Sequence, residues 1–249
     1  MTFSEGMQID TSTTSTGGGG VGRGIAIGGG VGGLVIVMLA LFLGVDPGQV
    51  ISQQPIQAQT QSGPGVDLSK CKTGADANKY VDCRVVATGN SVDGVWEQLL
   101  RGYSRPKMML FKGSVQTGCG PATSDVGPFY CPVDKTAYFD TDFFAVLKNQ
   151  FGSSGGPLAQ EYVVAHEYGH HVQNLLGVLG RAQQGAQGAT GNGVRMELQA
   201  DCYAGVWGHY AEQKGLLEVG DLDEALNAAT QIGDDAIQKR TRGYVVPES

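Results

Sequence analysis

The stretch at residues 161–176 constrains the fold more than any other part of the chain, and it reads EYVVAHEYGHHVQNLL. Within it, His166 and His170 are four residues apart in an HExxH pentad. On a helix, residues at this spacing share one face with their Cβ atoms about 5–6 Å apart, so both imidazoles can reach one metal ion. Zinc accepts such nitrogen donors in tetrahedral geometry. Glu167, which follows the first histidine, takes the general-base position of a zinc hydrolase.

A second long helix is predicted at residues 194–214, VRMELQADCYAGVWGHYAEQK. Glu197 and Asp201 lie four residues apart on one face of it, among residues small enough for the first helix to approach. We predict Glu197 as the third metal ligand and Asp201 as the acceptor of a ring N–H from a ligand histidine. A carboxylate pair on an apolar face is costly to bury unless it meets a cation or hydrogen-bond donors. The alternative is an exposed Glu/Asp pair.

Two further histidines are weaker ligand candidates. His171 lies about 100° round the helix from His170 and off its face. His209 lies about 120° round the second helix from Glu197 and about 18 Å along it, so it cannot replace Glu197 if the two helices face each other. We predict that His209 is a structural histidine, with a second hydrogen-bond donor near the substrate as the alternative.

Four motifs in the chain resemble those of the family described as putative neutral zinc metallopeptidases. They are HEYGHHVQ, ELQADCYAG, CGPATSDVGPFYCPVDKTAYFD and IGDD, and the resemblance covers roughly residues 20–249. It implies a gluzincin-like site with Zn²⁺ on His166, His170 and Glu197 and with Glu167 as the base. Asp201 matches the position that supports the metal ligands without binding the metal itself. Similar members continue past the VPES ending of this chain. We therefore expect either that this chain is a form truncated at Ser249 or that the resemblance ends there.

Four of the five cysteines fall into two pairs, each with its members 12 residues apart in turn-rich surroundings. We predict the disulfides Cys71–Cys83 and Cys119–Cys131, each stabilising the fold by about 3 kcal/mol in the chain-entropy model. Disulfides require an oxidising compartment. The alternatives are four free thiols or a zinc site, although no pair has CxxC spacing. Cys202 lies within the second helix and is predicted to be a small buried hydrophobe.

The N-terminal part of the chain predicts a membrane anchor. The 22 residues between Arg23 and Asp46 carry no charge, which is long enough to span a hydrocarbon core of about 30 Å. We therefore predict a disordered cytoplasmic tail at 1–22 and a transmembrane helix at 23–46, with a buried soluble helix and a cleaved signal peptide as the alternatives. Arg23 places the N-terminus inside. The predicted location is a single-pass protein of the cytoplasmic membrane with its catalytic domain outside.

Glycines spaced four apart in this segment, Gly28/Gly32 and Gly29/Gly33, would let a neighbouring helix approach and so allow an oligomer. Residues 47–66 are rich in Gln, Ser, Gly and Pro and predict a flexible linker. Residues 67–249 form the predicted zinc metallopeptidase-like domain.

Within that domain, short strands are predicted at 108–111 and 136–139, and helices at 143–151 and 220–240. A calcium site at Asp234-Asp235 is an alternative without EF-hand spacing to support it. The net charge of −7 and the absence of a Lys/Arg-rich run argue against a nucleic-acid partner.

Together these observations predict an α+β, predominantly helical zincin-like metallopeptidase domain preceded by one transmembrane helix. The predicted function is hydrolysis of peptide bonds in a peptide or protein substrate. The alternative is a catalytically inactive, membrane-tethered binding or regulatory protein whose zinc is structural or absent. A structural zinc would need a fourth protein ligand, for which His171 or Cys202 would have to approach.

Overall fold

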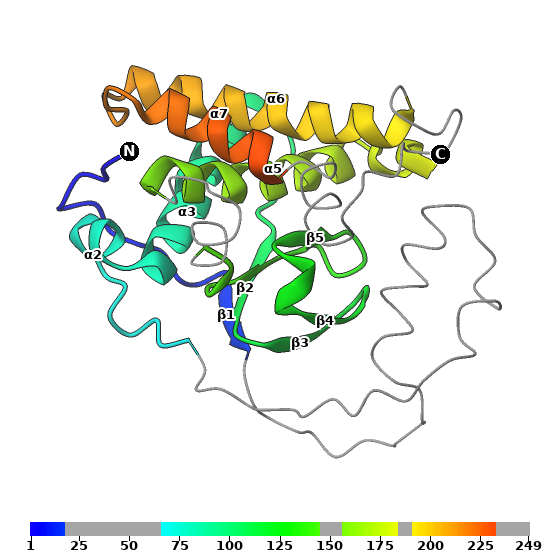
Figure 1. Ribbon diagram of the computed structural model, residues 1–249, viewed down its shortest axis with the longest axis horizontal. Helices are drawn as coiled ribbons and strands as arrows, with labels where there is room; N and C mark the ends of the chain where they lie inside the picture. Colours follow the sequence, from blue (N-terminus) through cyan, green and yellow to red (C-terminus); the bar gives the residue numbers. More distant parts are fainter. Residues whose placement is uncertain (18–65, 145–155, 184–190, 233–249) are drawn as a thin grey trace, which may run out of the picture.

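The computed structural model describes residues 1–17, 66–144, 156–183 and 191–232. This part of the chain is a mixed α and β fold, with its helices gathered on one side and its strands on the other (Figure 1). The predicted linker and the Gly-rich pairs lie outside the described residues, except that Val66 is described and buried. Most of the predicted helix at 143–151, the last turns of the helix at 220–240 and Asp234-Asp235 also lie outside them.

A four-stranded sheet has the order β1-β2-β6-β5. The strands are β1 (Thr14–Gly17), β2 (Lys107–Phe111), β5 (Phe129–Cys131) and β6 (Thr136–Asp140). The first three in this order are parallel, whereas β5 runs antiparallel to β6 and forms an edge. A separate hairpin joins β3 (Ser114–Thr117) to β4 (Gly120–Thr123). The predicted strands at 108–111 and 136–139 are confirmed, and every residue of β6 is buried, as expected for a central strand.

The longest helices pack around α5 (Pro157–Leu175), which contacts α6, α3 and α7 and also reaches β5 and β6 (Figure 1). The other helices with bounds in the described residues are α2 (Gly74–Lys79), α3 (Val81–Leu99), α6 (Asn192–Gln213) and α7 (Asp221–Ile232), with short 3₁₀ turns η2 (Ser124–Val126) and η3 (Leu179–Gln183). Proline in the first turn suits the start of α5, because that turn has N–H groups without helical partners. The two helices predicted around the pentad and residues 194–214 are therefore confirmed.

Residues 1–17 belong to the folded body, so the prediction that the tail is disordered is wrong for them. Phe3 is 1% exposed and lies in the main hydrophobic core. The side chain of Asn78 binds both the backbone N–H and the backbone C=O of Phe3, at 2.8 Å each. Asn90 clamps Asp10 in the same way, and β1 pairs with β2. These partners lie far along the chain, so the local composition of the tail did not indicate them.

The predicted membrane location is also corrected. In the described part of the chain, no helix is long and apolar enough to cross a membrane. The predicted span at 23–46 lies outside the described residues. A single span there would put residues 1–17 and 67–232 on opposite sides of the membrane. The pairing of β1 with β2 instead places the two segments in one sheet.

Both predicted disulfides are confirmed. Cys71–Cys83 has a Cα–Cα distance of 5.0 Å, and Cys119–Cys131 has one of 5.8 Å. The first joins the approach to α2 with α3, and the second joins the β3–β4 turn to β5. Cys202 is a free thiol and is exposed, so its prediction as a buried hydrophobe is wrong. It lies on the outer face of α6, whose buried positions are Ala200, Ala204, Trp207 and Ala211.

Candidate metal centre

The structure brings together three potential ligand atoms from α5 and α6. The Nε2 atoms of His166 and His170 are 3.1 Å apart. The Oε2 atom of Glu197 lies 3.3 Å from the first and 3.4 Å from the second. Tetrahedral donors at the usual zinc distances of about 2.0–2.1 Å lie about 3.3–3.4 Å from one another. The spacing of these three atoms therefore fits three corners of one zinc coordination tetrahedron.

The close crossing of α5 and α6 depends on Gly169, which lies between the two histidines. A Cβ atom placed on Gly169 would lie 2.9 Å from the carbonyl oxygen of Ala200 and 3.0 Å from its Cα. Only glycine allows this approach of the two backbones. Glu197 precedes Ala200 by three residues, so it lies on the same side of α6 as this crossing. The small residue inside the pentad thus helps to bring the third donor to the histidines.

The remote nitrogen of His166 is held by Asp201. Its Nδ1 lies 2.8 Å from Oδ1 of Asp201, and the hydroxyl of Tyr162 donates to the same oxygen. A carboxylate oxygen can only accept, so Nδ1 of His166 carries a proton, and Nε2 lies on the side of Glu197 and His170. The structure therefore places Asp201 against the ring of His166. The hydrogen bond from Tyr162 was missed, although Tyr162 lies four residues before His166.

The corresponding partner of His170 is Gln173, which the sequence analysis did not identify. Its Oε1 lies 2.9 Å from Nδ1 of His170. Its Nε2 donates to the carbonyl oxygen of Met196 at 2.6 Å, which fixes the orientation of the amide. Gln173 is fully buried, and it is three residues from His170 on the same helix. A glutamine three residues after a histidine of the pentad, and so on the same side of the helix, was the available signal.

Glu167 lies beside the three donors and is 7% exposed. Burial raises the pKa of its carboxyl group, although the charges of His166 and His170 oppose this effect. The backbone N–H of Tyr130 in β5 faces the carboxylate, and this dipole also lowers the pKa and so acts against the effect of burial. Burial therefore makes this carboxylate more basic than an exposed one, and the edge strand β5 lies beside it.

The charges of the donor set favour a cation. Burial lowers the pKa of His166, but hydrogen bonds to Asp201 and Glu197 outweigh it and raise that pKa to about 10. Burial raises the pKa of Glu197, but hydrogen bonds from His166 and His170 outweigh it and lower that pKa. A metal ion would compete with protons for the same nitrogen atoms.

The two rival histidines do not join the donor set. His171 is fully buried, and its two ring nitrogens are bonded to the hydroxyl of Tyr130 and the carbonyl oxygen of Ser104. His209 is exposed and bonded to Gln213. Among the described residues, the other cluster with metal-ligating side chains contains Cys71 and Cys83, whose sulfur atoms form a disulfide.

Comparison with known proteins assigns the chain to a family. The model of the family described as "Putative neutral zinc metallopeptidase" matches residues 4–249. The uncharacterized protein Rv2575 of Mycobacterium tuberculosis is 68% identical over 259 residues, covering 100% of this chain and 88% of the relative. The uncharacterized protein YpfJ of Escherichia coli K12 is 43% identical over 221 residues, covering 87% of this chain and 75% of the relative. No solved structure matches the chain. The family name implies zinc as the cofactor, and the chain belongs to this putative neutral zinc metallopeptidase family.

Proposed function

We propose that the protein is a zinc metallopeptidase that hydrolyses peptide bonds in a gluzincin-like site of a zincin-like domain. His166, His170 and Glu197 would hold the zinc ion, and Glu167 would act as the general base. The observation that carries this proposal is the triangle of donor atoms, with sides of 3.1, 3.3 and 3.4 Å, next to the carboxylate of Glu167. When bound, zinc supplies Lewis acidity toward the scissile carbonyl group and lowers the pKa of water.

The residues of the chain supply proton transfer and orientation. Glu167 accepts a proton from the attacking water and returns it to the leaving amine. The N–H of Tyr130 faces the carboxylate of Glu167 and favours its ionised form. Asp201 and Gln173 fix the ring orientation of the two histidines through their Nδ1 atoms.

The edge strand β5 supports a peptide or protein as the substrate class. β5 pairs with β6 on one side, and among the described strands none pairs with its other side. An extended peptide can add to such an edge through backbone hydrogen bonds. Because Tyr130 of β5 contacts Glu167, a peptide bound along this edge would pass close to the base.

The inactive alternative with a structural zinc has less support. It needs a fourth protein ligand. His171 is occupied by Ser104 and Tyr130, and Cys202 is exposed outside the donor set. In the described part of the chain, the donor set has three members, which leaves a corner for water and substrate.

The test is a comparison of the full chain with its Glu167→Gln variant. Glutamine keeps the shape of the side chain and cannot accept the proton. We expect one zinc ion per chain in both proteins by elemental analysis. Cleavage of a peptide library by the variant should fall by at least about 100-fold. Retained cleavage in this variant would contradict the assigned base.

A second pair of variants tests the third ligand. Glu197→Ala should lose zinc, whereas Glu212→Ala, an exposed glutamate near the other end of α6, should keep it. Equal zinc content in the two variants would show that Glu197 is not a ligand.

A further inference from the structure

The buried histidine that follows the pentad makes two hydrogen bonds that determine its tautomer. Nε2 of His171 lies 2.7 Å from the carbonyl oxygen of Ser104, which can only accept, so Nε2 carries the proton. Nδ1 of the neutral ring is then an acceptor, and the hydroxyl of Tyr130 lies 2.9 Å from it. Asn174 donates to the same hydroxyl oxygen at 2.9 Å. The hydroxyl of Tyr130 thus accepts from Asn174 and donates to His171.

Tyr130 therefore lies against α5 at both of its ends. Its hydroxyl is bound by His171 and Asn174, one turn apart on that helix, while its backbone N–H faces the carboxylate of Glu167 closely enough to lower the pKa of that group. The ring is buried between these two points. Any shift of β5 along α5 would move the N–H away from the carboxylate of Glu167.

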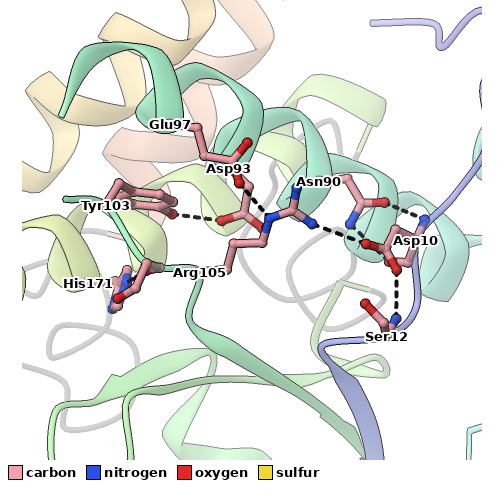
Figure 2. A network of polar contacts seen from close by, with 9 residues as sticks. Asp10, Ser12, Asn90, Asp93, Glu97, Tyr103, Arg105 and His171 are labelled. Carbon is pink, nitrogen blue, oxygen red and sulfur yellow. Dashed lines mark hydrogen bonds and ion pairs between the residues drawn. The ribbon is translucent and has the colours of Figure 1, made fainter. Parts of the chain in front are cut away.

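The loop after α3 holds His171 from its other side. The edge of the His171 ring packs against Tyr103, with ring centres 5.7 Å apart. The hydroxyl of Tyr103 donates to the buried carboxylate of Asp93 at 2.7 Å, and Arg105 extends the network to Glu97 (Figure 2). The position of His171 is therefore fixed by Tyr103, whose own position is fixed by Asp93.

We propose that His171 is a positioning residue, which acts through Tyr130 to hold the β5 N–H against the carboxylate of Glu167. Both of its ring nitrogens are bonded outside the donor set, to Tyr130 and Ser104. This role rests on the proposed function of Glu167 as the base. It also explains a buried histidine that adjoins a metal ligand and does not face the metal site.

The test combines His171→Leu, Tyr130→Phe and their double variant in the full, zinc-loaded chain. Each single change should lower kcat by about 10-fold to 100-fold, with little change in KM or zinc content. Both changes break the same hydrogen bond between Tyr130 and His171. The kcat of the double variant should therefore be no lower than that of the single variant with the lower kcat. Multiplied effects in the double variant would overturn the proposal.

Two further variants separate positioning from general damage to the fold. His171→Gln can still donate to Ser104 and accept from Tyr130, so it should restore most of kcat. Tyr138→Phe removes a hydroxyl from the neighbouring strand, where it binds Asp134, and should leave kcat unchanged. If Tyr138→Phe lowers kcat as much as Tyr130→Phe, the effect is not specific to this connection and the proposal fails.

Hydrogen exchange of the Tyr130 amide, followed by NMR, tests the same connection without catalysis. We expect protection of this amide to fall in His171→Leu and Tyr130→Phe and to persist in His171→Gln. Unchanged protection in the first two variants would overturn the positioning role. If the wild-type chain cleaves no peptide, the proposed function fails, while the exchange measurement still decides whether His171 positions Tyr130.

Discussion

At the scale of single residues, Gly169 controls the distance between the two helices that carry the donor set. In Gly169→Ala, the new Cβ would meet the backbone of Ala200 at 2.9–3.0 Å, and backbone atoms cannot move aside as a flexible side chain can. We expect a loss of about 1–3 kcal/mol in stability and weaker zinc binding, because Glu197 moves away with α6. Thermal unfolding and a zinc titration measure the two effects.

The matched control for this change is Gly205→Ala on α6, where a Cβ would meet no atom within 4 Å. Removing a helical glycine in open space should be neutral or stabilising by up to about 1 kcal/mol. Wild-type zinc affinity in Gly169→Ala would show that the helices tolerate a wider spacing than we infer.

Asp93 makes the stability depend on pH. It is 1% exposed, and burial raises the pKa of its carboxyl group from 3.8 to about 7, against the hydrogen bond from Tyr103. The folded state therefore binds this proton more tightly than the unfolded state. The ionised carboxylate destabilises the fold increasingly as pH rises from about 4 to about 7.

Asp93→Asn removes this cost and keeps an oxygen that can accept from Tyr103. We expect the variant to gain about 1–3 kcal/mol relative to wild type between pH 4 and pH 7, with a constant difference above that range. Urea unfolding of both proteins across this range measures the difference. Parallel stability curves would contradict a raised pKa at Asp93.

At the scale of elements, the two disulfides are expected to differ in their effect on activity. Removing either pair by double alanine substitution should cost about 3 kcal/mol, since both close loops of the same length. Cys131 follows Tyr130 in β5, whereas Cys83 lies in α3. We therefore expect only Cys119→Ala/Cys131→Ala to lower peptide cleavage at a temperature where both variants remain folded.

Thermal unfolding gives that temperature, and kcat on one peptide substrate is then compared between the two double variants. Equal kcat values would show that β5 does not need its disulfide to support Glu167.

The elements of the site could be predicted because their signals are local. Four-residue spacing placed His166 with His170 and Glu197 with Asp201, and each pair depends only on the geometry of one helix. The partners of these residues were harder to find. Gln173 needed the carbonyl oxygen of Met196 on another helix to fix its orientation, and Tyr130 lies on a strand far along the chain. Such contacts depend on how the elements pack, which periodicity does not describe.

In the molecule as a whole, the fold joins the N-terminal segment to the rest of the chain, although composition suggests that it is separate. Composition assigned residues 1–22 to a separate tail, because Ser, Thr and Gly give little apolar surface to bury. The structure instead inserts Phe3 into the main core and adds β1 to the sheet. The amino group of Met1 forms an ion pair with Asp221 at the start of α7, at 2.9 Å. Segments from both ends of the described chain thus meet beside α5.

This arrangement predicts that the first residues stabilise the whole domain. Phe3→Ala should cost about 3–5 kcal/mol in the free energy of unfolding, because it leaves a cavity in a core position that is 1% exposed. Ser15→Ala, an exposed position of β1, should change it by no more than about 0.5 kcal/mol. Urea unfolding of the full-length variants measures both. An unchanged stability in Phe3→Ala would mean that the segment contributes nothing to the core. A loss of this size in a single unfolding transition would show that β1, α5 and α6 belong to one cooperative fold.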